Sequence, residues 1–187
     1  MKKIDAKEIF SIPNIIGYFR ILMLPVFLYI YYHADSTAEY MGAFVLLAVI
    51  FLSDMLDGYI ARKYNMITNI GKILDPVADK LVQGTITIAV MFRHSLMKVF
   101  FGVFLCKEIY MAVMGVYLLK VKSSLNGAQW YGKACTAIVD VCILLLLFMP
   151  KLSETISNTI IAVMIALEIF TVVKYVQFHR GILKQQA

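Results

Sequence analysis

The sequence predicts an all-α integral membrane protein with six transmembrane helices and a short amphipathic helix at its N-terminus. Three observations support this fold class. Of the 187 residues, 61% are hydrophobic and 16% are charged, whereas soluble domains contain about 45–50% apolar and about 25% charged residues. The apolar residues form runs along the entire chain that reach the length of about 20 residues needed to cross a bilayer. The basic residues gather beside alternate ends of these runs. We therefore expect residues 1–187 to form a single transmembrane domain.

The N-terminal segment combines basic residues with an apolar run, which is also the pattern of a signal peptide. Its apolar run extends beyond the length of a signal-peptide core, and no small-residue cleavage site follows it. We interpret residues 5–10 as an amphipathic interfacial helix that leads into a retained first span. Pro13 suits the first turn of that span, where a missing N–H leaves no helical hydrogen bond unmade.

Six apolar segments, separated by polar sequences such as HADSTAE and KVKSSLNGAQ, are expected to cross the membrane. They are residues 14–33, 40–60, 71–92, 97–119, 131–149 and 156–178. An even number of spans places both termini on the same side of the membrane.

The distribution of Lys and Arg orients these spans. Of the 18 basic residues, Arg93, Lys98 and Lys151 lie on one side, Lys107 lies inside a span, and the others lie on the side of the termini. Cytoplasmic loops carry the excess of positive charge, so we expect both termini on the cytoplasmic side of a bacterial cytoplasmic membrane. The net charge of +6 then attracts anionic headgroups and phosphates rather than nucleic acid.

The cysteines predict neither disulfides nor a zinc site. Cys106, Cys135 and Cys142 lie in apolar stretches without framework spacing, and CxxC and HExxH patterns are absent from the sequence. We expect these cysteines to be small buried hydrophobic residues.

Four aspartates interrupt the apolar pattern, although a carboxylate in hydrocarbon is costly and usually marks a functional site. Asp54 and Asp57 lie near the cytoplasmic end of the second span, and Asp75 and Asp79 lie in the first turns of the third. Spacings of three and four residues place each pair on one helix face, and the short connector makes the two spans antiparallel neighbours. We therefore expect four carboxylates to meet just below the cytoplasmic surface.

Four carboxylates at close quarters repel one another unless cations neutralise them. Oxygen ligands favour Mg²⁺, Mn²⁺ or Ca²⁺ over zinc or copper. Two such ions suit displacement at phosphorus, because they neutralise the charge of the attacked and departing phosphates. The competing interpretation is structural: the aspartates would cap helices and pair with Arg62, Lys72 and Lys80.

Small and basic residues beside the aspartates predict room for a phosphorylated ligand. Gly58 and Ala61 lie on one side of the second span, and Gly71 lies one turn before the aspartates of the third. Arg62 and Lys63 lie at the rim, where a guanidinium can hold a phosphate through two parallel hydrogen bonds.

The run from Asp54 to Asp79 resembles the signature of the CDP-alcohol phosphotransferases, or CDP-alcohol phosphatidyltransferases. It reads DMLDGYIARKYNMITNIGKILDPVAD and matches the pattern DxxDGxxAR, eight residues, then GxxxDxxxD without a departure. The sequence IPNIIGYFRI, which contains Asn14, also resembles the opening of first spans in that family. With the number of spans, the resemblance covers essentially the whole chain.

This resemblance implies transfer from a CDP-linked lipid, usually CDP-diacylglycerol, to an alcohol, with release of CMP. It implies that the four aspartates hold two divalent ions, Mg²⁺ or Mn²⁺, and that Asp79 also acts as the base for the acceptor hydroxyl. It further implies that the protein is a homodimer. The residues that would bind the nucleotide and phosphates of the donor are Gly58, Ala61, Arg62, Gly71 and Asn14.

Weaker signals in the second half concern the acceptor. Lys107 begins a basic–acidic pair in the fourth span, and Lys133 and Thr136 lie near the start of the fifth, so these three are candidate acceptor-binding residues. Gly115 and Cys135 stand where phosphatidylglycerophosphate synthases of the family carry cations, and CMP-forming cardiolipin synthases resemble the region at least as well. Glycerol 3-phosphate and phosphatidylglycerol both stay open as acceptors. Lys107 could instead form an internal ion pair, and Lys133 could anchor the span at the boundary.

Other functions fit the sequence less well. An ion- or proton-coupled transporter would place its carboxylates near the midplane and show inverted repeats or broken helices. An intramembrane prenyltransferase has more spans and a different aspartate spacing, and a family member that only binds lipid would not need all four aspartates. Outside the signature, we expect Glu168 to pair with Lys107 or Lys174.

Overall fold

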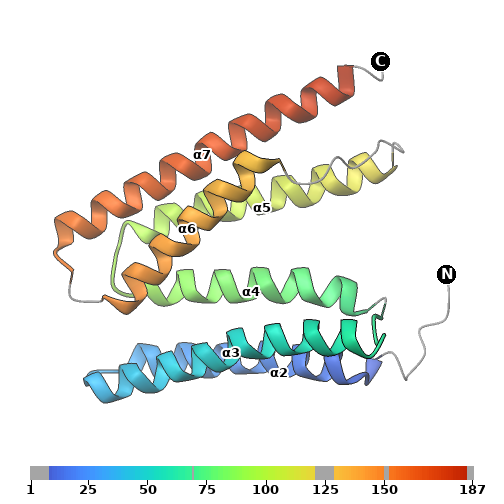
Figure 1. Cartoon of the computed structure of the whole chain (residues 1–187). Coiled ribbons are helices and arrows are strands. Elements are labelled where there is room, and N and C mark those ends of the chain that lie inside the picture. The colour runs from blue at the N-terminus through green and yellow to red at the C-terminus, as the bar shows by residue number, and fades with distance from the viewer. Residues whose placement is uncertain (1–8, 69, 121–128, 150–151, 185–187) are drawn as a thin grey trace. The chain divides into compact units, whose positions relative to one another are not determined.

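The computed structural model describes residues 9–68, 70–120, 129–149 and 152–184, and within these ranges the chain forms helices and no strand. Six long helices match the six predicted segments in order (Figure 1). They are α2 Ile12–His33, α3 Thr37–Lys63, α4 Gly71–Met91, α5 Met97–Lys120, α6 Trp130–Phe148 and α7 Glu154–Lys184. The predicted interfacial helix at residues 5–10 lies largely outside the described residues.

Five of these helices, α2, α3, α5, α6 and α7, are long and apolar enough to cross a membrane. Only 17–33% of their most apolar windows is buried inside the protein, so the remaining apolar surface favours a hydrocarbon surrounding, as an integral membrane protein requires. α4 differs because Lys72, Asp75, Asp79 and Lys80 occupy its first half. A membrane crossing by α4 therefore stays a prediction.

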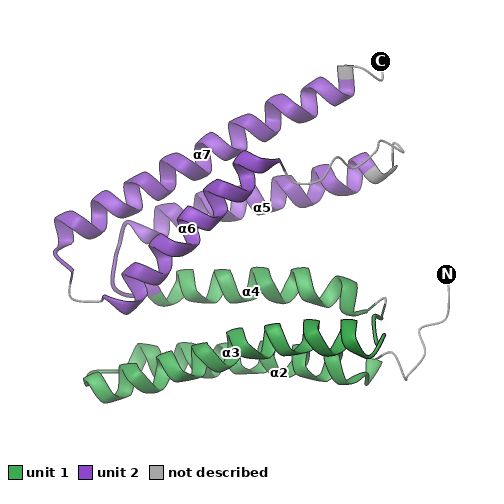
Figure 2. Ribbon diagram, in the orientation of Figure 1, with its two compact units in different colours: residues 1–89 green, residues 90–187 purple. Residues whose placement is uncertain are grey.

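The chain divides into two compact units, residues 1–89 and residues 90–187 (Figure 2). The first unit holds α2, α3 and nearly all of α4, and the second holds α5, α6 and α7. The expectation of one domain stays a prediction beside this division.

In the first unit, α2 and α3 pack along a seam of residues that recur every three or four positions. The buried residues of α2 that recur in this way are Asn14, Gly17, Arg20, Leu24, Phe27 and Tyr31; of these, Gly17 faces Leu74 of α4 and Asn14 is hydrogen-bonded to Thr68. The corresponding residues of α3 are Ala43, Leu47, Ile50, Ser53 and Asp57. The seam is apolar over most of its length and becomes polar where the first half of α2 meets the last part of α3.

Local hydrogen bonds fix both ends of α3. At its start, Ser36 and Glu39 form a capping box, which satisfies free backbone N–H groups. At its end, Asn65 adopts φ 53° and the N–H of Met66 donates to the carbonyl of Ala61 at 3.0 Å. This is the Schellman arrangement that stops a helix and turns the chain, and it directs the connector toward α4.

In the second unit, α7 packs against both α5 and α6. Gly132 of α6 allows a close approach to α7, because a Cβ at this position would collide with the ring of Tyr175. Tyr110 of α5 and His179 of α7 are joined by a hydrogen bond of 3.0 Å between Oη and Nδ1. These contacts tie both neighbouring helices to the last third of α7.

Candidate functional site

The signature aspartates lie at the polar end of the α2–α3 seam, where three of them meet Arg20 of α2. Nη1 of Arg20 donates to Oδ1 of Asp54 and to Oδ1 of Asp79 at 3.4 Å. Nη2 of Arg20 donates to Oδ2 of Asp57 at 3.4 Å. The predicted convergence of carboxylates from α3 and α4 is therefore present for these three side chains, around a guanidinium from a third helix.

The helix lengths explain why these groups share one depth. Arg20 lies eight positions after Ile12, the first residue of α2, and Asp79 lies eight positions after Gly71, the first residue of α4. At about 1.5 Å per residue, each lies about 12 Å along its helix. Asp57 lies six positions before the last residue of α3, or about 9 Å from that end.

The group has a buried floor and an open edge. The side chains of Arg20 and Asp57 are 1% and 6% exposed, whereas those of Asp54 and Asp79 are 45% and 62% exposed. The floor thus holds a compact ion pair, and the two outer carboxylates present oxygens that a ligand can reach.

Asp75 joins this group through its field rather than through direct contact. Its side chain is exposed, and it interacts electrostatically with Arg20, Asp57 and Asp79. Asp57, Asp75 and Asp79 therefore act on one another electrostatically, and Asp54 joins the group through its contact with Arg20. The structural interpretation expected the aspartates to pair with Arg62, Lys72 and Lys80, but the ion-pair partner of three of them is Arg20. Nζ of Lys80 donates to Oε1 of Gln83 at 3.3 Å.

Asn14 positions the start of α4. Its amide exchanges hydrogen bonds of 3.1 and 3.2 Å with Oγ1 of Thr68, and Thr68 in turn accepts the N–H of Gly71 at 2.9 Å. A Cβ at Gly71 would lie 3.0 Å from both Oδ1 of Asn14 and Oγ1 of Thr68. Packing thus explains this glycine, and donor binding by Asn14 and Gly71 stays a prediction.

The rim of α3 is more open. A Cβ at Gly58 would lie 3.6 Å from Nη2 of Arg62, which is an ordinary contact distance. Arg62 is exposed and Ala61 is half-buried. Packing within the first unit therefore does not require glycine at position 58, and the space beside it remains available to a ligand.

The carboxylates suit a divalent cation in chemistry, but they are arranged around Arg20. In the described part of the chain, no three His, Cys, Asp or Glu side chains form a group that could hold a metal ion as they stand. All the donors are hard oxygens, which Mg²⁺ and Mn²⁺ prefer. Three carboxylates in contact with one guanidinium also carry more negative than positive charge. The carboxylates therefore fit a divalent cation, provided that Arg20 moves away from them.

In the second unit, Lys107 of α5 is engaged by glutamates. Its Nζ lies 2.9 Å from Oε2 of Glu168 in α7 and 3.2 Å from Oε1 of Glu108. Lys107 and Glu168 are 4% and 2% exposed. The expectation that Glu168 pairs with Lys107 or Lys174 is confirmed for Lys107. The other predicted acceptor residues of this unit differ, since Lys133 is exposed and Thr136 is half-buried.

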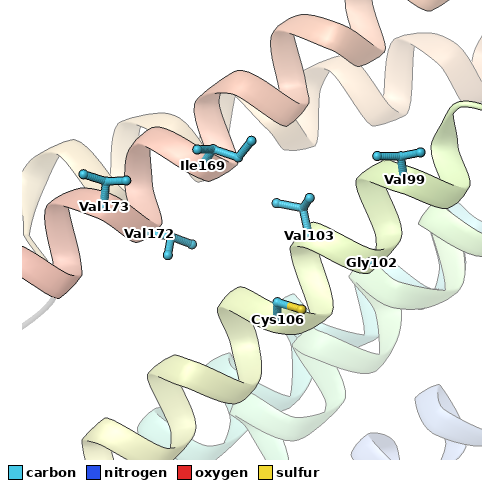
Figure 3. A pocket seen from close by; sticks show the side chains of 7 residues that line it. All are labelled: Val99, Gly102, Val103, Cys106, Ile169, Val172 and Val173. Carbon is cyan, nitrogen blue, oxygen red and sulfur yellow. The ribbon is translucent and has the colours of Figure 1, made fainter.

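The second unit also contains an apolar pocket of about 440 Å³ between α5 and α7 (Figure 3). Its lining residues are Val99, Gly102, Val103, Cys106, Ile169, Val172 and Val173. No charged side chain is among them, so the pocket suits hydrocarbon and offers nothing to a phosphate.

The cysteines differ from expectation at one position. Cys135 is buried and Cys142 half-buried, whereas Cys106 is exposed and lines the apolar pocket. The prediction of burial was wrong for Cys106, because a cysteine on an apolar helix is also stable where that helix faces hydrocarbon rather than protein.

A comparison with protein families gives a match over most of the chain. The sequence model described as CDP-alcohol phosphatidyltransferase matches residues 10–173. The chain belongs to the CDP-alcohol phosphatidyltransferase family. The resemblance that the aspartate signature predicts is thereby confirmed.

Several curated relatives carry the name CDP-diacylglycerol–glycerol-3-phosphate 3-phosphatidyltransferase. The protein of Rickettsia typhi is 35% identical over 114 residues, which is 61% of this chain and 64% of the relative. That of Aquifex aeolicus is 32% identical over 136 residues, or 72% and 74%. That of Salmonella typhimurium is 26% identical over 181 residues, or 95% and 99%. The match thus covers less than two thirds of the Rickettsia relative and nearly all of the Salmonella relative.

Arg20 is the residue of this family site that sequence reasoning did not assign. Two signals were present: Arg20 belongs to the stretch IPNIIGYFRI that resembles the opening of first spans in the family, and Asn14, Gly17 and Arg20 recur every three residues on an otherwise apolar span. A polar stripe of that kind indicates a face that packs on protein rather than on lipid.

Proposed function

We propose that this phosphatidyltransferase transfers the phosphatidyl group of CDP-diacylglycerol to glycerol 3-phosphate and releases CMP. The observation that carries the proposal is the meeting of carboxylates from α3 and α4 at one point, with exposed oxygens on Asp54 and Asp79. The family match and the names of the relatives support the donor and the acceptor.

In the proposed reaction, the acceptor hydroxyl oxygen attacks the phosphorus on the diacylglycerol side of the pyrophosphate. The bond between that phosphorus and the bridging oxygen breaks, and CMP takes the electron pair. Asp79 accepts the hydroxyl proton, since its side chain is the most exposed of those around Arg20. Most of the rate enhancement would come from positioning and from neutralised charge.

Asp54, Asp57, Asp75 and Asp79 would hold two ions of Mg²⁺ or Mn²⁺, by analogy with the family. Bound cations supply charge neutralisation of the pyrophosphate, which makes CMP a better leaving group. Gly58, Ala61 and Arg62 would then line the path of the nucleotide along the rim of α3, with Asn14 and Gly71 supporting the start of α4.

Glycerol 3-phosphate is the acceptor that the relatives' names favour over phosphatidylglycerol. Lys107 is a weaker candidate for the acceptor phosphate, because two glutamates already surround it. Lys133 and Thr136 remain the acceptor candidates of the second unit. We further propose a homodimer in the cytoplasmic membrane of a bacterium, with the aspartates on the cytoplasmic side.

The test uses purified protein in lipid nanodiscs with CDP-diacylglycerol, Mn²⁺ or Mg²⁺, and each candidate acceptor in turn. We expect mass spectrometry to find phosphatidylglycerol phosphate with glycerol 3-phosphate and no cardiolipin with phosphatidylglycerol. Cardiolipin as the sole product would contradict the choice of acceptor. No CMP release with any alcohol would contradict the proposed reaction.

Asp79→Asn tests the role of the base. We expect a loss of CMP release of at least about 100-fold, because proton transfer by a positioned group typically contributes about 10²–10⁴-fold. Asp35→Asn is the matched control, since Asp35 is exposed just before the opposite end of α3. Normal turnover by a folded Asp79→Asn protein would remove Asp79 from this role.

A further inference from the structure

Arg20 is the most buried charge of the aspartate site. Its side chain is 1% exposed and is among the largest fully buried side chains of the described residues. A buried guanidinium is stable only when anionic partners and hydrogen bonds compensate for lost hydration. Arg20 therefore depends on the aspartates, and the aspartates depend on Arg20.

The contacts of Arg20 involve the oxygens proposed to hold a divalent cation. Its Nη1 is shared between Asp54 of α3 and Asp79 of α4, and its Nη2 contacts Asp57. A guanidinium and a metal ion bind the same lone pairs of a carboxylate, so both do not occupy one set of oxygens together.

The hydrogen bonding of Arg20 is also incomplete. Its Nε is buried and has no acceptor among the described residues. A guanidinium carries five N–H donors in a fixed fork that matches phosphate oxygens. This unused donor, in a side chain that is almost fully buried, points to a further anionic group at the site.

We propose that Arg20 is a built-in counter-cation that holds Asp54, Asp57 and Asp79 together until divalent cations bind, and that it then transfers its fork to a phosphate of the CDP-linked donor. This inference rests on the proposed function. It makes Arg20 a positioning residue for the metal-binding carboxylates and a binding residue for the donor. It also explains how carboxylates that stand ready for cations stay together in their absence.

The proposal predicts opposite effects on metal affinity and on stability. Arg20→Met removes the competing charge, so the folded protein should bind Mn²⁺ at least about tenfold more tightly than the wild type. Without metal the same variant should unfold at a lower temperature, because the carboxylates then repel one another. Added Mn²⁺ should raise its unfolding temperature more than that of the wild type.

The experiment uses the full chain in nanodiscs after chelation of metals. Electron paramagnetic resonance measures free Mn²⁺ during a titration, and thermal unfolding is followed with and without Mn²⁺. Arg93→Met is the matched control. Arg93 lies beyond Met91, the last residue of α4, and at about 1.5 Å per residue this places it about 20 Å or more along the chain from Asp75 and Asp79. It should leave the Mn²⁺ affinity unchanged.

Arg20→Lys provides a second variant that keeps the charge and loses the fork. We expect Mn²⁺ affinity close to that of the wild type and a KM for CDP-diacylglycerol raised about tenfold, with a smaller change in the KM for the acceptor. If Arg20→Met does not fold, the Mn²⁺ affinity of Arg20→Gln is compared with that of the wild type instead.

Two failures are distinguishable. If the wild type binds no Mn²⁺ at millimolar concentration, the metal-dependent function itself is wrong. If the wild type binds Mn²⁺ and the uncharged Arg20 variants bind it equally or more weakly, the function stands and the counter-cation proposal is overturned. An unchanged KM for the donor in Arg20→Lys would overturn the transfer to phosphate.

Discussion

Lys107 shows how strongly a single residue can affect the stability of this protein, because its charge is buried between two helices. Nζ contacts Glu168 of α7 as well as Glu108 of its own helix. Removing one partner of a buried ion pair costs about 3–5 kcal/mol, since the other charge stays buried without compensation. Replacing both partners of such a pair by apolar residues of similar volume can leave the stability unchanged.

We therefore expect Lys107→Met to lower the free energy of unfolding by about 3–5 kcal/mol and the double variant Lys107→Met with Glu168→Leu to restore much of it. Thermal or denaturant unfolding in detergent measures both. Lys98→Met, at an exposed position of α5, is the control and should change little. If the restored double variant shows a normal KM for the acceptor, Lys107 is structural; a KM raised tenfold or more would return it to the acceptor site.

At the scale of elements, the connector between α3 and α4 determines how the aspartates of the two helices meet. Asn65 at φ 53° ends α3, and Thr68, held by Asn14, starts α4. Both residues act on the backbone, and neither touches the carboxylates through a contact described above. The geometry of the site thus depends on turn chemistry outside it.

Asn65 offers the clearest test of this dependence. Asn65→Val should lower stability by about 1–2 kcal/mol, because a β-branched residue is strained in the left-handed region, whereas Asn65→Gly should be tolerated. Unfolding temperatures and CMP release measure the effect. Met66→Val is the control at the next position of the connector. An Asn65→Val protein with unchanged stability would show that the turn does not determine the end of α3.

At the scale of the whole molecule, the sequence was sufficient for the number, order and approximate bounds of the long helices, because apolar runs of bilayer length leave little choice. α4 was identified despite its charges because its second half is apolar. The aspartate spacing correctly placed Asp54, Asp57 and Asp79 together. It did not identify Arg20, since a contact across 34 positions of sequence depends on how helices pack rather than on any local period.

Other parts were beyond the sequence for similar reasons. The role of Asn14 depends on Thr68, which lies 54 positions later. The exposure of Cys106 depends on which face of α5 meets α7, and apolar residues lie all around α5. Residue type alone carries no information about such faces.

The membrane crossing of α4 is testable in cells. In a chain without its native cysteines, Met66→Cys and Ser95→Cys place exposed thiols before and after α4. We expect a membrane-impermeant maleimide to label Ser95→Cys in intact cells and Met66→Cys only after lysis. Labelling of both from the same side would show that α4 does not cross. Labelling of Met66→Cys alone in intact cells would reverse the assignment of sides.

The burial of Arg20 among side chains of α3 and α4 also has a consequence for biogenesis. When the ribosome has delivered only α2 to the translocon, this guanidinium has no carboxylate to meet. An arginine within a lone span is unfavourable, with a cost that reaches about 2.5–3.5 kcal/mol at the bilayer centre and is smaller near the boundary. α2 is then expected to wait beside the translocon until α3 arrives, so that the two enter the lipid as a hairpin. A chain truncated between them should integrate poorly, and the aspartates of α3 would then also be needed for the insertion of α2.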